Sequence, residues 1–381
     1  MRVLIDYRPA LRERTGVGEY VFQLARALLT AYGPAARETP LQLTLFSSSW
    51  KDRLDADAAI AGASIVDRRV PVGVLNALWH RLGWPAAETL TGVPFDVAHS
   101  PHPLLVPARS AAQVVTIHDL YFLSHPEGSM AEVRRDYPAL ARQHAHRADH
   151  IIVPSQATAL DVQRRFEVDA ARISVCPHGR PPWPAREGAP AHGYVLFLGT
   201  LEPRKNVGGL LDAYERLLGQ RQARRGPAVP ELVLAGKASE QAAAVLERIR
   251  KPPFAGLVRH IGYVDPARRR ELYEGACLLV QPSFEEGFGL PVLEAMTIGV
   301  PVVAANRGGL PEVLGDAGLL VDPEDPDAMA AAIDRLLTDE ATIAASVSKG
   351  VLRSKQFDWH HAAHGVYAAY RRAIEHHAHR H

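Results

Sequence analysis

The chain has 381 residues, 47% of them hydrophobic and 22% charged, and its formal net charge is +1. This length predicts two domains, and the composition is typical of a soluble globular protein without the overall charge that attracts nucleic acid. We expect no signal peptide, because the chain turns polar after position 5, and no spanning helix, because no apolar run approaches roughly 20 residues. Cys176 and Cys277 lie in apolar stretches, which favours a reducing cytoplasm over a disulfide framework.

Short apolar runs with the length of buried strands alternate along the chain with amphipathic helical stretches. We expect strands at residues 3–5, 41–46, 114–117, 151–153, 173–175, 195–198, 232–234, 278–280, 302–304 and 319–321. Helices are expected between them, for example at 20–29, 207–218 and 327–337. This alternation predicts an α/β fold with parallel sheets that are covered by helices on both faces.

Prolines and glycines at 177–190 interrupt any regular element and predict a linker. We therefore expect one Rossmann-like, doubly wound domain at 1–178 and a second at 191–354. The remaining segment, 355–381, contains an amphipathic helix, and a simple interpretation would leave this helix on the second domain.

In the first half, two segments place candidate ligand-binding residues after expected strands. Gly16 and Gly18 lie where a helix begins, although a Gly-x-Gly pair also fits a plain tight turn. His118 and Asp119 follow the strand at 114–117, at the end where parallel sheets bind ligands. A histidine in that position is not typical of a core, so we treat it as a candidate site residue.

In the second half, a turn with two cations follows the strand at 195–198. Pro203 favours the turn, Arg204 and Lys205 come next, and Asn206 is a suitable helix N-cap. We expect both cations to be exposed at the carboxyl end of the sheet, where they would neutralise a diphosphate. The alternative is a pair of solvated surface charges.

Residues 285–299 form the most informative segment, which combines a strand end, a glycine loop and a helix start. Gly287 and Gly289 allow a ligand to approach the backbone closely, and the helix start offers free N–H groups to an anion. Pro291 suits the first helical position, and Gly299 suits the residue after the helix end.

The same segment contains two carboxylates, Glu286 in the loop and Glu294, which we expect in the first turn of the helix. A carboxylate beside an anion site repels the anion, so its useful partner is a neutral hydroxyl donor such as a ribose. A phosphate flanked by two hydroxyl-binding carboxylates describes a nucleotide-sugar site. The alternative is that the acidic residues only complement the helix dipole.

The spacing of Glu286 and Glu294 resembles the E-x7-E signature of the retaining glycosyltransferases of family 4. The segments at 204–206 and 118–119 are similar to further motifs of that family. The resemblance covers essentially the whole chain and implies the GT-B fold, in which two Rossmann-like domains face each other across a cleft. It also implies that the C-terminal helix packs back on the N-terminal domain.

The resemblance further implies roles for the candidate residues. His118 and Glu286 would contact the donor sugar, Arg204 and Lys205 its leaving diphosphate, and Glu294 the nucleotide ribose. With Glu294, the donor-binding set comprises Gly16, Gly18, Asp119, Tyr263, Gly287, Phe288, Gly289 and Leu290, and Asp119 would also help to shape the acceptor pocket. Thr200 stands where many relatives have an arginine, so we expect one cationic contact fewer.

The start of the chain, residues 5–9 and 15–18, looks like the family 4 branch that contains O-antigen mannosyltransferases. This implies retaining transfer of a hexose, best matched by mannose from GDP-mannose, to a saccharide or lipid-linked saccharide, without cofactor or metal. We expect a front-face route in which the leaving diphosphate accepts the acceptor proton. A GT-B-fold sugar-nucleotide epimerase and a non-catalytic sugar-nucleotide binding protein stay open as alternatives.

Three further segments have the composition of metal sites. Asp55 and Asp57 match a D-x-D pattern, but no buried strand precedes them, so we expect a solvated helix. The acidic run at 322–327 is better explained as a helix start at Asp325 and Pro326. The histidine-rich end, 376–381, is interpreted as a frayed, solvated tail rather than a metal site.

A lipid-linked acceptor would imply peripheral contact with the inner face of the membrane. The stretch at 74–84 has helical spacing of its apolar residues, and a helix of this kind either meets the bilayer or packs on its own core. The expected apolar stripe is Leu75, Leu78, Trp79 and Leu82, with His80 and Arg81 on another face, and nearby basic residues are Arg134, Arg135, Arg142 and Arg147.

Overall fold

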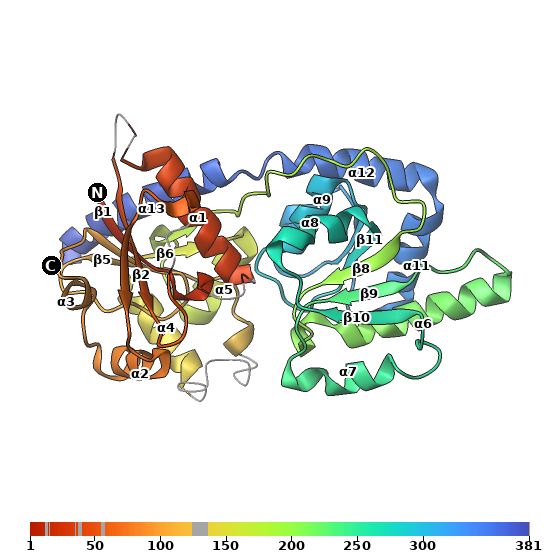
Figure 1. The fold of residues 1–381 in the computed structure, drawn as a ribbon, viewed down its shortest axis with the longest axis horizontal. Coiled ribbons are helices and arrows are strands. Elements are labelled where there is room, and N and C mark those ends of the chain that lie inside the picture. The colour runs from red at the N-terminus through yellow and green to blue at the C-terminus, as the bar shows by residue number, and fades with distance from the viewer. Residues whose placement is uncertain are drawn as a thin grey trace. The chain divides into compact units, whose positions relative to one another are not determined.

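The computed structural model describes residues 1–11, 14, 16–34, 36, 40–54, 58–123 and 136–380. They form two compact units (Figure 1). Unit 1 comprises residues 1–179 and 358–381, and unit 2 comprises residues 180–357. Each unit contains one parallel β-sheet between layers of helices, which confirms the expected α/β fold class.

The sheet of unit 1 has seven parallel strands in the order β3-β2-β1-β4-β5-β6-β7. The strands are β1 (Arg2–Asp6), β2 (Gln42–Ser48), β3 (Ser64–Arg68), β4 (Val97–Ser100), β5 (Ala112–Thr116), β6 (His150–Val153) and β7 (Ile173–Val175). The chain adds strands on one side of β1 first and then continues with β4 on the other side. The carboxyl ends of β1 and β4 are therefore the topological switch point of this sheet, where α/β folds bind ligands.

The helices of unit 1 are α1 (Gly16–Tyr32), α2 (Val72–Leu82), α3 (Ala87–Thr91), α4 (Tyr137–Arg147), α5 (Gln156–Phe166) and the C-terminal α13 (Trp359–Arg380). Helices α1 and α13 share one hydrophobic cluster with Val3 and Ile5 of β1. Leu4 points to the opposite face, where it packs with Leu75 and Trp79 of α2. The alternation of side chains along β1 thus buries both faces of the sheet.

The sheet of unit 2 has six parallel strands in the order β10-β9-β8-β11-β12-β13. They are β8 (Tyr194–Leu198), β9 (Leu232–Ala235), β10 (Val258–Gly262), β11 (Ala276–Gln281), β12 (Val302–Ala305) and β13 (Leu319–Val321). The helices are α6 (Val207–Arg224), α7 (Ala243–Arg248), α8 (Pro266–Glu274), α9 (Leu290–Ile298), α10 (Leu310–Leu314), α11 (Pro326–Thr338) and α12 (Glu340–Ser354). Figure 1 shows α8 and α9 on one side of this sheet and α6 on the other.

The expected strand positions are confirmed, and the structure adds three strands that were not expected, β3, β4 and β10. β3 and β10 are edge strands with much partly exposed surface, so they lack a continuous apolar run. β4 is fully buried but ends in His99 and Ser100, whose polarity conceals the strand in the sequence. His99 is satisfied inside the core by Thr116 (2.8 Å) and by Tyr370 of α13 (2.7 Å).

Candidate active site

The carboxyl ends of β8 and β11 form the switch point of the unit 2 sheet, because the strand order reverses between these two neighbours. The loop after β8 makes a short 3₁₀ turn over Pro203–Lys205. Asn206 then caps α6, and its side chain accepts a hydrogen bond from the backbone N–H of Gly209 (3.2 Å). Proline, two cations and an asparagine cap thus place Arg204 and Lys205 at the edge expected for a ligand.

Lys205 is buried and ion-paired with Glu286, which follows β11. Ser283 lies 3.3 Å from the same carboxylate oxygen, and Nη1 of Arg204 lies 3.9 Å from it. Arg204 is also ion-paired with Glu202, whose carboxylate oxygen lies 2.6 Å from Nε of Arg204. The expectation that both cations are exposed is wrong for Lys205, which is only 6% exposed, because Glu286 compensates its charge inside the protein.

Lys205, Arg204 and Glu286 shift each other's pKa values. Burial, and then the neighbouring Arg204, lower the pKa of Lys205, while Glu286 opposes that shift. Burial alone would raise the pKa of Glu286, but Lys205 and Arg204 outweigh it, so this pKa lies below its usual value. The cluster therefore holds two cations beside one buried carboxylate, which is suited to exchanging that carboxylate for an anionic ligand.

The glycine loop after Glu286 packs against a second pair of glycines, Gly308 and Gly309, after β12. The N–H of Gly309 donates to the carbonyl of Glu286 (2.8 Å), and a Cβ at Gly308 would lie 2.2 Å from that oxygen. Gly289, with φ of 100°, turns the chain into α9. Gly308 and Gly309 were not expected as site residues, although two consecutive glycines after a strand are a readable signal.

Glu294 is the fifth residue of α9, so the expectation of a first-turn position is wrong; Pro291 is second rather than first. Its buried carboxylate faces α8, where Nη1 of Arg269 lies 3.1 Å away and the hydroxyl of Tyr273 donates at 2.8 Å. Neither α8 residue was expected at the site, because their contact with Glu294 depends on tertiary packing.

The other donor-side candidates of unit 2 occupy separate positions. Leu290 begins α9, and Gly299 ends it in a left-handed conformation as expected. Phe288 is buried and packs edge-on against Phe357, with ring centroids 5.7 Å apart. Tyr263 follows β10, two strands away from β8, with Nζ of Lys237 5.7 Å from its ring centroid.

In unit 1, His118 and Asp119 follow β5. Nε2 of His118 donates to the carbonyl of Pro101 (3.2 Å), and the ring lies edge-on to Tyr20 at 4.8 Å. Burial lowers the pKa of His118 to about 4, so the imidazole is neutral near pH 7. Asp119 accepts a hydrogen bond from the N–H of Tyr121 (3.2 Å).

Gly16 is the first residue of α1 and is exposed. Gly18 lies in the first turn, where a Cβ would be 2.6 Å from the carbonyl oxygen of Pro9. A side chain at position 18 would therefore push α1 away from the turn that follows β1. The structure thus gives Gly18 a packing role that stands independently of any ligand.

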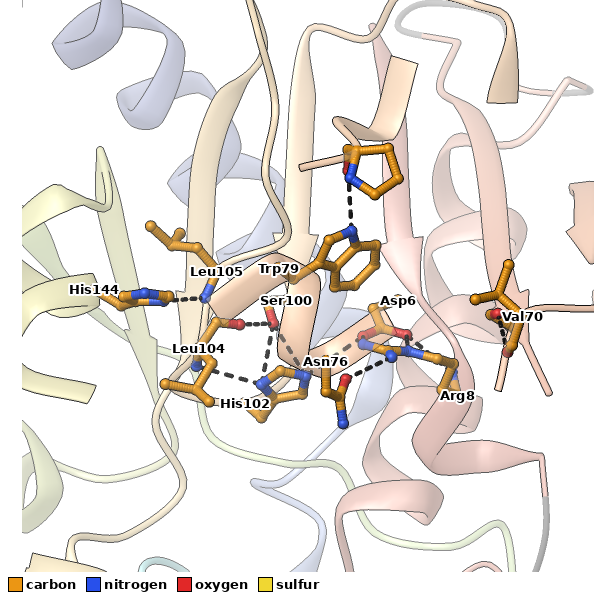
Figure 2. Close-up of polar contacts among 12 residues, drawn as sticks. Asp6, Arg8, Val70, Asn76, Trp79, Ser100, His102, Leu104, Leu105 and His144 are labelled. Carbon is orange, nitrogen blue, oxygen red and sulfur yellow. Dashed lines mark hydrogen bonds and ion pairs between the residues drawn. The ribbon is translucent and has the colours of Figure 1, made fainter. Parts of the chain in front are cut away.

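The switch point of unit 1 carries a buried polar network (Figure 2). Asp6, at the end of β1, accepts two hydrogen bonds from the guanidinium of Arg8 (2.8 and 2.6 Å), which also donates to Asn76 of α2 (2.8 Å). Nε2 of His102, beyond β4, lies 3.4 Å from Asp6. The guanidinium of Arg8 also stacks on Trp79, 4.6 Å from the ring centroid.

The charges of this network balance each other. Burial alone would raise the pKa of Asp6, but Arg8 and His102 outweigh it, so this pKa lies well below its usual value. Asp6 is fully buried, whereas the side chain of His102 is 20% exposed. Apart from Asp6 and Arg8, which were noted only as part of a family-like start, these residues were not expected as site residues.

Two family models match the chain: "Glycosyltransferase Family 4" at residues 14–182 and "Glycosyl transferases group 1" at residues 192–339. The chain is also 31% identical over 393 residues to O-antigen chain mannosyltransferase B of Escherichia coli, which covers 97% of this chain and 100% of that protein. The chain belongs to glycosyltransferase family 4. It is therefore a glycosyltransferase.

Solved structures show that this family 4 glycosyltransferase has the GT-B fold. Sucrose-phosphate synthase of Thermosynechococcus elongatus matches with a TM-score of 0.72 at 20% identity, over 97% of this chain and 98% of that chain. Anabaena HepE in complex with UDP-glucose matches with a TM-score of 0.68 at 18% identity, again over 97% and 98%. At these identities the likeness shows the fold alone.

The segments with the composition of metal sites have structural roles where the structure describes them. Asp325 caps α11 as expected, and its side chain accepts from the N–H of Ala328 at 2.9 Å. We expected a frayed tail, and this expectation is wrong for the described residues. Helix α13 continues to Arg380, and Nδ1 of His377 lies 3.1 Å from the carboxylate of Asp149. Asp55 and Asp57 lie outside the described residues. Within the described residues, no cluster of three or more His, Cys, Asp or Glu is arranged to hold a metal ion.

Proposed function

We propose that this family 4 glycosyltransferase transfers mannose from GDP-mannose to a saccharide hydroxyl, with retained anomeric configuration, during assembly of a surface polysaccharide such as O-antigen. The observation that carries the proposal is the gathering of Arg204, Lys205 and Glu286 at the switch point of unit 2. The sugar and the polymer are suggested by the E. coli O-antigen mannosyltransferase, which aligns over its whole length.

The donor diphosphate is bound by Arg204 and Lys205. When it arrives, its oxygens compete with Glu286 for Lys205, and the displaced Glu286 can accept hydrogen bonds from sugar hydroxyls. As the bond between the anomeric carbon and the diphosphate breaks, negative charge grows on the leaving oxygen, and the two cations stabilise it. His118, in its neutral form, and backbone amides near Phe288 and Gly289 orient the sugar.

The acceptor oxygen forms its bond to the anomeric carbon on the face that the diphosphate leaves, and its proton passes to the diphosphate. This front-face route requires no protein nucleophile and retains the configuration. It also requires no divalent metal, because Arg204 and Lys205 supply the positive charge that the leaving group needs.

The acceptor is bound by unit 1, and we propose that a lipid-linked acceptor brings this unit to the inner face of the membrane. Among the helices that the structure describes, none has the length and hydropathy of a membrane span. Leu75 and Trp79 of the expected stripe are buried in the core, so this part of α2 follows the alternative in which the helix packs on its own core. Leu82 of the same stripe is exposed, and the other exposed apolar residues at this helix and just after it are Val72, Val74 and Trp84.

Incubation with a panel of nucleotide sugars, followed by measurement of nucleoside-diphosphate release and of the sugar product, tests the function. A transferase releases the nucleoside diphosphate by transfer or slow hydrolysis. An epimerase of this fold would also return a changed sugar, and a binding protein would release nothing. Lack of release with every nucleotide sugar would contradict the proposal.

A further inference from the structure

The carboxylate of Glu294 is held by two residues that project from one face of α8. Arg269 and Tyr273 are four residues apart, so they are neighbours on the helix surface. Nη1 of Arg269 lies 3.1 Å from Oε1 of Glu294, and the hydroxyl of Tyr273 donates to Oε2 at 2.8 Å. Each oxygen of the carboxylate therefore has its own anchor, which fixes both the position and the rotation of the group.

All three side chains are largely withdrawn from water. The side chains of Arg269 and Glu294 are only 13% and 5% exposed, and Tyr273 is fully buried. Burial, and then the negative charge of Glu294, raise the pKa of Tyr273 well above its usual value. The phenol therefore stays protonated and acts as a donor to the carboxylate.

A buried ion pair of this kind contributes little net stability to a fold. Desolvation of the two charges largely offsets their attraction, and apolar residues of similar volume often stabilise a protein as well or better. Perturbed, buried polar groups beside a ligand-binding edge are more often placed for function. The hydroxyl of Tyr273 also lies 3.2 Å from the carbonyl of Pro291, so it ties the carboxylate to the first turn of α9.

We propose that Arg269 and Tyr273 are positioning residues that orient Glu294 for the ribose hydroxyls of the donor nucleotide. This inference rests on the proposed function and on the expected contact of Glu294 with the ribose of the donor nucleotide. An oriented carboxylate accepts hydrogen bonds from a ribose without having to be ordered on binding, and it favours ribonucleotides over deoxyribonucleotides. Arg269 and Tyr273 thereby set the selectivity for the sugar of the nucleotide without touching the nucleotide.

The test measures dissociation constants by calorimetry for four probes: GDP, 2′-deoxy-GDP, UDP and 2′-deoxy-UDP. The wild-type protein is expected to prefer the ribose form of the nucleotide it binds better. Tyr273→Phe keeps the ring and removes the hydroxyl. It should therefore weaken binding of the ribonucleotide about tenfold and binding of the deoxyribonucleotide much less. Arg269→Gln should act in the same direction, and Arg269→Lys should restore part of the preference.

Two matched variants control for general loss of stability. Tyr214→Phe removes another buried hydroxyl, which donates to Pro230 (2.7 Å) in the opposite hydrophobic cluster of unit 2. Arg270→Gln removes the neighbouring arginine of α8, which pairs with Glu274 at the surface. Both should keep the wild-type ratio of ribose to deoxyribose affinity, even if Tyr214→Phe lowers the unfolding temperature as much as Tyr273→Phe does.

The outcomes separate this inference from the proposed function. If folded Tyr273→Phe and Arg269→Gln keep the wild-type ratio, the positioning role is overturned while nucleotide binding stands. If the wild-type protein binds ribonucleotide and deoxyribonucleotide equally, the ribose-reading role of Glu294 is overturned, and this inference with it. If the wild-type protein binds neither GDP nor UDP, the proposed donor function fails as well.

Discussion

The buried ammonium of Lys205 lies against the carboxylate of Glu286, so the group proposed to bind the diphosphate is ion-paired with the group proposed to bind the sugar. Because Glu286 compensates its charge, Lys205 can be buried before the ligand binds. The pairing also links the two halves of the donor site, because a diphosphate that captures Lys205 releases Glu286. Substitutions at either position should therefore affect both stability and function.

Lys205→Met should lower turnover by about 10²-fold or more, comparable to the loss of one oxyanion-hole donor. Because it leaves Glu286 buried without its cation, it should also lower the free energy of unfolding by about 3 kcal/mol. Lys205→Met with Glu286→Gln should recover stability but not turnover. Urea unfolding and nucleoside-diphosphate release measure the two effects, and near-normal turnover in Arg204→Ala combined with Lys205→Ala would remove the diphosphate assignment.

The two glutamates should differ in their effect on nucleotide binding. Glu294→Ala is expected to weaken binding of the free nucleoside diphosphate as well as binding of the whole donor. Glu286→Gln should spare or strengthen nucleoside-diphosphate binding, because it frees Lys205, and should impair transfer. Calorimetry with GDP and UDP checks this, and an inverted pattern would show that the two roles are exchanged.

Unit 1 should lose stability as the pH falls below about 6.5. Burial lowers the pKa of seven described histidines of this unit: to about 4 for His118 and His144, to about 3 for His80, His99 and His150, and below the usual value for His178 and His364. The unfolded chain binds these protons near pH 6.5 and the folded chain only near pH 3–4, so protonation favours unfolding in that window. One such histidine corresponds to about 2 kcal/mol at pH 5.

Urea unfolding between pH 7.5 and pH 4.5 measures this dependence. His99→Gln, which removes one of the buried imidazoles, should flatten the slope relative to the wild-type protein. A free energy of unfolding that does not change over this range would show that these histidines are accessible to solvent or bind protons in the folded state.

Membrane contact predicts that the protein sediments with anionic vesicles but not with neutral ones, and less so as salt is raised. Leu82→Ser with Trp84→Ser should reduce this binding, whereas Leu352→Ser, an equally exposed leucine of unit 2, should not. Each basic residue near the surface would contribute about 1 kcal/mol.

The contribution of nearby arginines to vesicle binding is tested separately. Arg142 and Arg147 lie in α4, and Arg134 and Arg135 lie outside the described residues. If all four can be neutralised without changing vesicle binding, the membrane does not meet this surface. If nothing binds even at low salt, the acceptor is soluble.

The sequence was sufficient to predict ten of the thirteen strands that the structure describes, because strands such as β8 and β11 are buried on both faces and appear as continuous apolar runs. The strand β4 was missed because His99 is polar, and its buried partner Tyr370 comes from α13, 271 residues away. Local sequence does not encode such a contact.

The candidate site shows the same division. The glycine loop and the cap at Asn206 have local signatures, so they could be predicted. The burial of Lys205 and the anchoring of Glu294 by Arg269 arise only when separate loops and helices meet, so spacing along the chain does not reveal them. The sequence left two interpretations of α2 open, because an apolar stripe does not say which of its residues reach the core; Leu75 and Trp79 do, and Leu82 does not.

Retention during glycosyl transfer is the central claim, and the first hexose released from GDP-mannose tests it most directly. The reaction is run without acceptor and in excess chelator, and early ¹H NMR spectra identify the anomer before mutarotation. We expect α-mannose and GDP, formed by the wild-type protein and not by Lys205→Met. Release of β-mannose would contradict retention, and activity only after Mn²⁺ or Mg²⁺ is restored would contradict metal independence.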